Sequence, residues 1–261
     1  MDKIKEYAKL AQEILGNNTA YAHDKKMISD IFKVSDIDNF EKIKLRLTII
    51  DSYYSTQMSK RLFGIEEIAK EIETINDKDL SEMFLNFLKN PDKEEYILKL
   101  FNLKFGCNKV GKKIKTAPSL ISKYAYFLTN FKFPIYDSLA KISYDMLQKK
   151  YSDMKLEKLE NNDIKGYFNK IKNLNEITGI NDYDVLDNFL WLYGKLTQGS
   201  FSLILKKENY LELVNSITFK SRDSRGQDLE ISQYIKSNLN NKKLSEIFSH
   251  EMIKFIKFCY K

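Results

Sequence analysis

The sequence predicts an all-α fold. Only three prolines and nine glycines occur in 261 residues, which leaves few of the turn signals that a β-rich chain needs. Leucine, lysine, glutamate and isoleucine dominate, a composition typical of helices joined by short connections. Hydrophobic residues make up 43% of the chain, which suffices for the core of one large folded unit.

The N-terminal part shows clear helical periodicity. Residues 1–16 place apolar side chains on one stripe and stop at Gly16, a common helix terminator. A short helix is expected over residues 24–32, and the Asp36-Ile37-Asp38 segment is expected to cap a helix that begins near Phe40. Residues 42–58 are apolar around much of the helical circumference, so this helix should be central and mostly buried.

The middle of the chain predicts further short helices over residues 65–75 and 79–89. Asn90-Pro91-Asp92 is a start signal, with Asn90 as N-cap, for a helix that should run to about Phe105 and end at Gly106. A basic turn then leads into a helix over residues 119–129, and the next helix should begin near Asp137.

The C-terminal part predicts helices near residues 162–173, 182–195, 207–213 and 245–260. Residues 214–232 have the weakest helical pattern, and we expect an exposed loop or short hairpin there. This segment holds two of the four arginines, Arg222 and Arg225. Trp191, the only tryptophan, is expected to lie in the core.

Positive charge is concentrated in one segment. Residues 96–136 contain eight lysines and no acid, whereas the whole chain has a net charge of +7, so the remaining residues sum to −1. A local cationic face suits a polyanion, because lysines that neutralise phosphates release condensed counterions. An AT-rich coding genome would also enrich lysine, but it does not explain why acids are missing from this segment alone. The lysines are Lys99, Lys104, Lys109, Lys112, Lys113, Lys115, Lys123 and Lys132.

Cysteine and histidine are too sparse for metal chemistry. Cys107 and Cys259 are far apart in sequence, and His23 and His250 are isolated. This pattern predicts incidental thiols in a reducing compartment and neither a protein-ligated metal nor an iron–sulfur cluster. With no apolar run of about 18 residues and no cleavable leader, we expect a cytoplasmic monomer that has no cofactor and no membrane contact.

Two charged residues in or next to the basic segment have two interpretations each. Asp137 is either an ordinary N-cap or a carboxylate at the rim of a cationic groove, where it would orient water or stabilise positive charge on a sugar. Lys123 is either a solvated lysine or an amine with a depressed pKa that attacks a sugar C1′ atom. Sequence spacing alone leaves both choices open.

Polar residues interrupt the end of the buried helix predicted over residues 42–58. Tyr53, Tyr54, Ser55, Thr56 and Gln57 follow one another there. Their hydroxyl groups either lie at the surface of a packed helix or contact nucleic acid. Aromatic rings and an amide beside a basic groove would suit stacking on bases, or filling the gap left by an extruded nucleotide.

The order of these segments resembles the helix-hairpin-helix DNA glycosylase superfamily, the group that includes endonuclease III and the 8-oxoguanine glycosylases. Residues 47–56 are similar to the polar segment that ends a buried helix in that family, and residues 123–125 followed by Pro134-Ile135-Tyr136-Asp137 resemble its Lys-Thr-Ala and Val-Asp succession. The resemblance covers roughly residues 40–147. It departs at the hairpin, where Ser119 and Ile121 replace glycines, and in the shorter interval from lysine to aspartate.

The resemblance implies a bilobal helical fold with a DNA-binding cleft between its lobes. Residues 42–133 would form a central lobe, and residues 1–41 plus 134–261 the second. It implies a glycosylase, with or without AP-lyase activity, that excises a flipped base from double-stranded DNA in repair or defence. The catalytic residues that it implies are Asp137 and Lys123. The basic turn is expected to supply the DNA contacts Lys109, Lys112, Lys113 and Lys115, together with Ser119. The expected base-pocket or gap-filling residues are Tyr54, Thr56, Gln57 and Tyr136.

Two alternatives stay open at this point. The first is a non-catalytic DNA-binding module of a restriction or phage-defence system, which the altered hairpin favours. The second is an all-helical protein-interaction domain whose basic face reflects genome composition. The glycosylase should release bases from DNA, whereas the non-catalytic module should not. Both of these should bind duplex DNA at physiological salt, whereas the protein-interaction domain should not.

Overall fold

The computed structural model describes residues 2–16, 20–160 and 163–260 of the 261. Within these ranges the chain forms fourteen α-helices, three short 3₁₀ helices and one two-stranded sheet. The fold is therefore all-α, as the sequence predicts. The first residues of the helices expected at positions 1 and 162 lie outside the described residues.

The first half of the chain contains most of the short elements. In order, these are α1 (Asp2–Gly16), α2 (Ala20–Ile31), α3 (Asn39–Tyr54), η1 (Met58–Lys60), α4 (Gly64–Ile72), α5 (Asp77–Lys89), α6 (Glu95–Asn102), β1 (Lys104–Cys107), β2 (Lys113–Thr116) and α7 (Pro118–Leu128).

The second half is helical throughout. It comprises α8 (Ser138–Lys150), η2 (Ser152–Met154), α9 (Ile164–Ile177), α10 (Tyr183–Thr197), η3 (Phe201–Leu203), α11 (Lys207–Asn215), α12 (Ser224–Ser237), α13 (Lys242–Ile247) and α14 (His250–Tyr260). Among the described residues, no helix is both long enough and apolar enough to cross a membrane.

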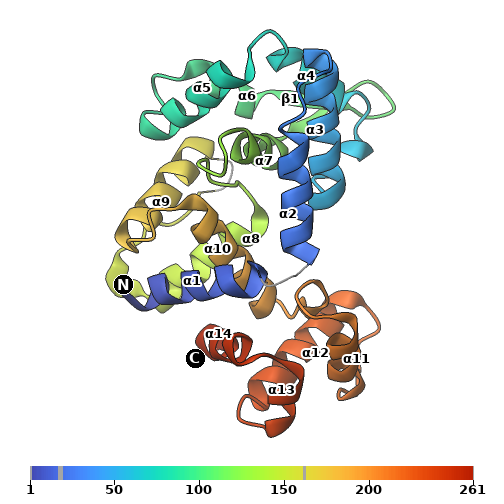
Figure 1. Cartoon of the computed structure of the whole chain (residues 1–261), viewed down its shortest axis with the longest axis vertical. Coiled ribbons are helices and arrows are strands. Elements are labelled where there is room, and N and C mark those ends of the chain that lie inside the picture. Colours follow the sequence, from blue (N-terminus) through green and yellow to red (C-terminus); the bar gives the residue numbers. More distant parts are fainter. Residues whose placement is uncertain (1, 17–19, 161–162, 261) are drawn as a thin grey trace.

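The helices are arranged along one long axis (Figure 1). Helices α2–α7 and the β-hairpin lie at one end, α1 and α8–α10 lie in the middle, and α11–α13 lie at the other end. Helix α1 packs against α10 and α14, so both ends of the chain meet in the middle group. Helix α2 packs against both α1 and α3 and so joins the middle group to the upper one.

Helix α3 begins where the sequence predicts, but it ends at Tyr54 instead of Met58 and is not mostly buried, since only five of its sixteen residues are buried. The Asp38 side chain caps it, since its Oδ1 atom accepts a hydrogen bond of 2.9 Å from the Phe40 amide. The helix ends at Tyr54 because Ser55 adopts a left-handed conformation with φ 50°. Arg46, only 1% exposed, makes two 2.9 Å bonds to the Asp77 carboxylate at the start of α5.

The predicted basic turn is a β-hairpin instead. Helix α6 ends at Asn102 rather than near Phe105, and β1 pairs with β2 in an antiparallel register. Gly106 and Gly111 have φ of 73° and 75°, and a Cβ atom on Gly106 would lie 2.7 Å from the Arg61 Cβ atom. The alternation of lysine with Ile114 and Thr116 in β2 is a strand pattern that the helical interpretation overlooked.

Three other predicted boundaries are wrong. Residues 245–260, which were expected to form one helix, are divided at Phe248 into the end of α13 and the whole of α14. Asn90 is the C-cap of α5 and not the N-cap of the next helix, because Pro91 lies in a turn and α6 begins only at Glu95. Within residues 214–232, which we expected to be a loop or hairpin, helix α12 begins at Ser224. Its N-cap is Asp223, which accepts a hydrogen bond from the Gly226 amide.

Aromatic side chains form two dense parts of the core. One joins α5, α6 and α9 to the segment before α8, and the other joins α1, α10 and α14. Such ring pairs add specific edge-to-face contacts to the burial of apolar area. The first part contains Phe84, Phe87, Phe101, Phe133 and Phe168, and the second contains Tyr7, Phe189, Tyr193, Phe255 and Phe258.

Candidate active site

Lys123 and Asp137 form an ion pair in which the lysine is buried. The Lys123 Nζ atom lies 3.2 Å from Asp137 Oδ2 and 2.8 Å from Ser119 Oγ, and 5.3 Å from the centre of the Tyr54 ring. The Lys123 residue is 2% exposed. The interpretation of Lys123 as a solvated lysine is therefore wrong.

Asp137 is at once a helix cap and the partner of Lys123. Its Oδ1 atom accepts hydrogen bonds from the Leu139 and Ala140 amides at 2.6 and 3.2 Å, at the start of α8. Burial acts to raise the pKa of Asp137, but Lys123 and the two amides outweigh it and hold this pKa below its usual range. The carboxylate thus stays ionised at neutral pH.

The extended segment before α8 is held against α7, and this brings the pair together. The Tyr136 amide donates to Ser122 Oγ at 2.9 Å, and the Tyr167 hydroxyl donates to the Ile135 carbonyl at 2.6 Å. Pro118 at the start of α7 pre-sets the helical backbone of the helix that carries Lys123. The position of Asp137 is therefore set by packing on two sides.

An aromatic cavity of about 330 Å³ opens beside Asp137. Its walls come from the start of α2, the end of α3, the start of α8 and the last turns of α10. Trp191 was expected to lie in the core, but it is only partly buried and lines this cavity. The remaining lining residues are Ala20, Tyr21, Asp24, Tyr53, Tyr54, Ser55, Asp137, Leu139 and Lys195.

One face of α10 carries the polar residues that sequence reasoning missed. Asp184, Asp187, Asn188, Trp191 and Lys195 follow helical spacing, and this stripe of charges beside a tryptophan was visible in the sequence. The pKa of Asp187 is raised to about 7, first by burial and then by the charge of Asp137, with Asp184 adding to the effect and Lys25 and Lys123 opposing it. This face of α10 thus carries a carboxyl group whose pKa is raised toward neutrality.

Gly194 lets α10 approach α8 closely. A Cβ atom at this position would lie 2.8 Å from Ser143 Oγ and 3.1 and 3.3 Å from the side chain and carbonyl of Leu139. Leu139 follows Asp137 by two residues, and Lys195 follows Gly194. The missing side chain therefore places Lys195 next to the first turn of α8.

Of the four predicted base-pocket residues, Tyr54 lines the cavity. Tyr136 is 9% exposed, packs its ring against Tyr167 and is approached by the Lys141 ammonium, so it lies outside this lining. The Thr56 hydroxyl donates to Asp51, and Gln57 is exposed in a left-handed conformation with φ 65°. The structure thus separates Tyr136 from the cavity and leaves Gln57 beyond its rim.

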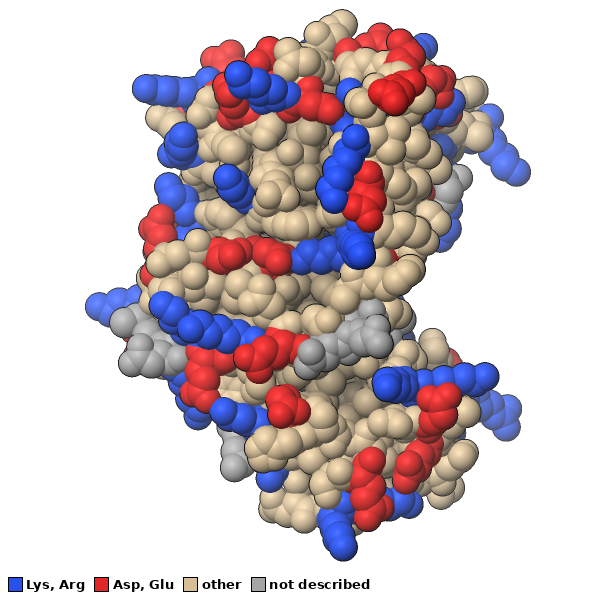
Figure 2. Space-filling view, viewed as in Figure 1, with Lys and Arg blue, Asp and Glu red and all other residues tan. Residues whose placement is uncertain are grey.

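The predicted DNA-binding lysines lie on the hairpin. Lys109, Lys112, Lys113 and Lys115 are all exposed, and Lys113 pairs with Glu67 at 2.5 Å. Figure 2 shows basic side chains projecting at the edge where Figure 1 places the hairpin. Ser119 instead lies in the first turn of α7 and accepts a hydrogen bond from Lys123, so its hydroxyl supports the ion pair.

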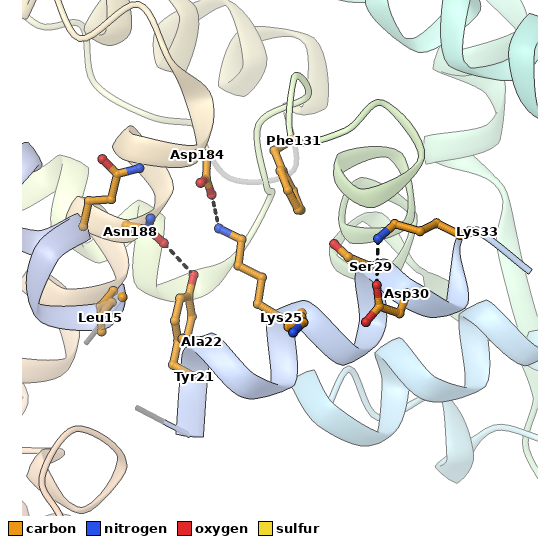
Figure 3. Close-up of a pocket in the computed structure, with 13 residues that line it drawn as sticks. Leu15, Tyr21, Ala22, Lys25, Ser29, Asp30, Lys33, Phe131, Asp184 and Asn188 are labelled. Atoms are coloured by element: carbon orange, nitrogen blue, oxygen red, sulfur yellow. Dashed lines mark hydrogen bonds and ion pairs between the residues drawn. The ribbon is translucent and has the colours of Figure 1, made fainter. Parts of the chain in front are cut away.

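A second cavity, of about 410 Å³, lies between α1, α2, Phe131 and α10 (Figure 3). The ammonium of Lys25, which lines this cavity, pairs with Asp184, which also accepts a hydrogen bond from the Tyr126 hydroxyl. The same ammonium lies 4.8 Å from the centre of the Phe131 ring. Tyr21 lines both cavities, and its hydroxyl donates to Asn188 at 2.8 Å.

Among the described residues, no group of three or more histidine, cysteine or acidic side chains is arranged to hold a metal ion. Cys107 and Cys259 are both free thiols.

No protein-family model, curated protein or solved structure is significantly similar to this chain.

Proposed function

We propose that this protein is a DNA glycosylase that extrudes a base from duplex DNA into the aromatic cavity and cleaves its bond to the sugar. The observation that carries the proposal is the buried Lys123–Asp137 ion pair, with Asp137 at the edge of a cavity lined by Tyr54 and Trp191. Helix capping needs no buried lysine behind the carboxylate, so the pair supports a role in chemistry as well as in structure.

Asp137 would stabilise the reaction at the sugar. Breaking a glycosidic bond places positive charge on C1′ and the ring oxygen, and a fixed anion next to that position lowers the barrier. Because Lys123 and the α8 amides keep Asp137 ionised, the carboxylate is ready to do this or to orient a water molecule. Lys123, on α7, stabilises the negative charge of Asp137 by donating a hydrogen bond to its Oδ2 atom.

The cavity suits an extruded base. Its volume of about 330 Å³ falls within the range of small-molecule sites, about 300–1,000 Å³. Tyr54 and Trp191 would supply aromatic rings for stacking. In other nucleic-acid complexes, replacing such an aromatic residue by alanine weakens binding by about 1–3 kcal/mol per stacked base.

The hairpin would hold the phosphate backbone. Its exposed lysines lie outside the cavity, on a segment that pairs through Cys107 with Leu62, shortly after α3 ends at the cavity. The proposal includes a bilobal arrangement with DNA in a cleft between its lobes, one formed by residues 42–133 and the other by residues 1–41 plus 134–261.

The test is base release from duplexes that carry a panel of normal, modified and mismatched bases. We expect alkali-labile sites with the wild-type protein and none with Asp137→Asn, which keeps the α8 cap but removes the charge. Asp182→Asn is the matched control, because Asp182 caps α10 in the same way and is exposed. Loss of DNA binding together with base release would contradict the proposed catalytic role of Asp137.

A second candidate is a non-catalytic DNA-binding module. The observation that favours it is that both carboxylate oxygens of Asp137 already accept hydrogen bonds. Oδ1 accepts from the amides of the first turn of α8, and Oδ2 accepts from the Lys123 ammonium. A protein that binds duplex DNA but never yields alkali-labile sites on the panel would support this candidate over the glycosylase.

A further inference from the structure

We propose that Lys195, and not Lys123, is the amine that forms a covalent imine with the sugar, which would make the protein a glycosylase with lyase activity. This inference rests on the proposed function, because it assigns a second group to the same cavity. It differs from the family resemblance, which assigns the amine to Lys123.

Lys123 is poorly placed to attack a substrate. Its side chain is 2% exposed, and its ammonium already contacts Ser119, Asp137 and the face of Tyr54. Moving this group into the cavity would break both hydrogen bonds and leave the Asp137 carboxylate without its cation. Leaving a partly buried carboxylate without its cation is unfavourable.

Lys195 has the properties that Lys123 lacks. It lines the cavity beside Asp137, and within the described part of the chain its ammonium takes part in no ion pair or hydrogen bond. The ammonium lies 5.7 Å from the centre of the Trp191 ring, where an aromatic face holds a cation without occupying its donors. It can therefore leave this position at little cost.

The surroundings of Lys195 also favour its neutral amine, so that its pKa is lower than that of a lysine in water. Burial lowers the pKa of Lys195, although the charges of Asp137 and Asp228 act in the opposite direction. A lysine must lose a proton before it can attack carbon, so partial burial beside a carboxylate that can accept this proton is a suitable environment.

The position of Lys195 is set by the packing of two helices. Gly194 brings α10 against Leu139, and Asp137 is the cap of the same α8 turn. A sugar held beside Asp137 would therefore meet Lys195 from the α10 side and the carboxylate from the α8 side. Both groups are on rigid elements, as a reactive pair requires.

The chemical step balances without an added oxidant or reductant. The neutral Lys195 amine forms a bond to C1′ as the bond from C1′ to the base breaks, and the base leaves with the electron pair. A proton from the new ammonium passes through Asp137 to the departing base. The nitrogen lone pair then opens the sugar ring, O4′ takes up a proton from water, and a C1′ iminium remains. Water or hydroxide removes a C2′ proton, and the 3′ phosphate leaves with the electron pair of its bond to C3′ in a β-elimination.

The test uses a duplex with one preformed abasic site, so that no knowledge of the target base is needed. The full-length protein is incubated with this duplex and with cyanoborohydride, which reduces the imine to a stable amine. Trypsin cannot cut after a modified Lys195, so we expect the adduct on a peptide of residues 173–206. An adduct on Lys123, on a hairpin lysine or on any other amine would overturn the proposal, and so would the absence of an adduct.

Three variants complete the test. Lys195→Arg keeps the charge over Trp191 but forms no stable imine, so its adduct should fall to background, as should that of Lys195→Gln. Lys93→Gln removes an exposed lysine outside the cavity lining and should trap as well as the wild type. Trapping that persists in Lys195→Arg would overturn the proposal, even if the chain folds normally.

A parallel alkali treatment of the base panel separates the two hypotheses. Alkali-labile sites without any reductive adduct would reject Lys195 as the nucleophile and leave the glycosylase standing. No alkali-labile site on any substrate, together with no adduct, would reject both.

Discussion

The Asp137 carboxylate divides its two oxygens between two tasks, with Oδ1 capping α8 and Oδ2 bound to Lys123 Nζ at 3.2 Å. The lysine is 2% exposed and the aspartate side chain 23% exposed, so the pair has one buried end and one end open to the cavity. A carboxylate anchored in this way keeps its orientation whether or not a ligand is present.

Lys123→Met should destabilise the protein by about 2 kcal/mol at pH 7, because it leaves Asp137 partly buried without its cation. The pKa of Asp137 is depressed in the folded state, so the pair stabilises the fold above the unfolded value of 3.8 and loses this effect as the pH falls through the lower folded value. Urea unfolding of both proteins from pH 7 to pH 3 measures this.

The matched control for that experiment is Lys93→Met, which removes an exposed lysine. It should change the free energy of unfolding by no more than about 0.5 kcal/mol at any pH. A penalty for Lys123→Met that is the same at pH 3 and pH 7 would mean that the ion pair contributes nothing to stability.

Asp187→Asn should stabilise the protein at pH 8 and leave it unchanged near pH 4. The folded-state pKa of Asp187, about 7, is higher than its unfolded value of 3.8, so the folded state binds more protons between these values. Stability therefore falls as the pH rises through this window, and an uncharged amide removes the loss. We expect a gain of up to about 4 kcal/mol at pH 8, since one pKa unit corresponds to about 1.4 kcal/mol, and about 2–4 °C in melting temperature for each kcal/mol gained.

Thermal melts at pH 4, 6 and 8 check this prediction, with Asp182→Asn as an exposed control on the same helix. If the melting-temperature difference between Asp187→Asn and the wild type does not depend on pH, Asp187 does not titrate near neutrality.

Replacing Lys109, Lys112 and Lys115 together by glutamine should weaken duplex binding and flatten its salt dependence. Each phosphate contact that is lost should reduce the slope of log K against log salt by about 0.9. Lys113 is left in place because its partner Glu67 already neutralises it in the free protein. Binding isotherms from about 50 to 200 mM salt measure the slope.

The control removes three exposed lysines elsewhere, Lys78, Lys89 and Lys93, for an equal change in net charge. If both triple variants change the slope equally, the hairpin has no special role and the protein responds only to total charge.

Gly194→Ala should strongly lower the yield of the reductive adduct at an abasic site and only modestly lower the free energy of unfolding. The added methyl group meets Leu139 and Ser143 in a packed interface, where overpacking costs about 1–3 kcal/mol, while alanine favours the helix by up to about 1 kcal/mol. A shift of α10 away from α8 would separate Lys195 from Asp137. The control is Gly16→Ala, since a Cβ atom there meets nothing within 4 Å.

Local patterns in the sequence were enough to predict most helices and to offer the cap as one of two interpretations of Asp137. The aspartate capping α3 and the apolar stripe of α1 were equally readable, because caps and amphipathic faces depend on neighbouring residues. The β-hairpin was missed because its two strands have only four residues each and follow a helix that ends early.

The cavity was harder to predict, since its walls come from segments that are far apart in sequence. Tyr21 and Trp191 meet at 4.8 Å between ring centres, and nothing in either segment indicates the other. The pairing of Lys123 with Asp137 was within reach because both belong to one short stretch. Lys195 was not, because its proximity to Asp137 depends on the packing of α10 against α8.

The short connection from the cavity to the hairpin limits how far apart these two points can lie, and so how much DNA they could span under the proposed function. Ser55 lines the cavity, and seven residues later Leu62 pairs with Cys107 in β1. Seven extended residues reach at most about 25 Å. Since consecutive base pairs are about 3.4 Å apart, a nucleotide in the cavity and a phosphate at Cys107 would be separated by no more than about seven base pairs. Under the proposed function, the DNA between the extruded base and the base of the hairpin would therefore be shorter than one turn of the double helix.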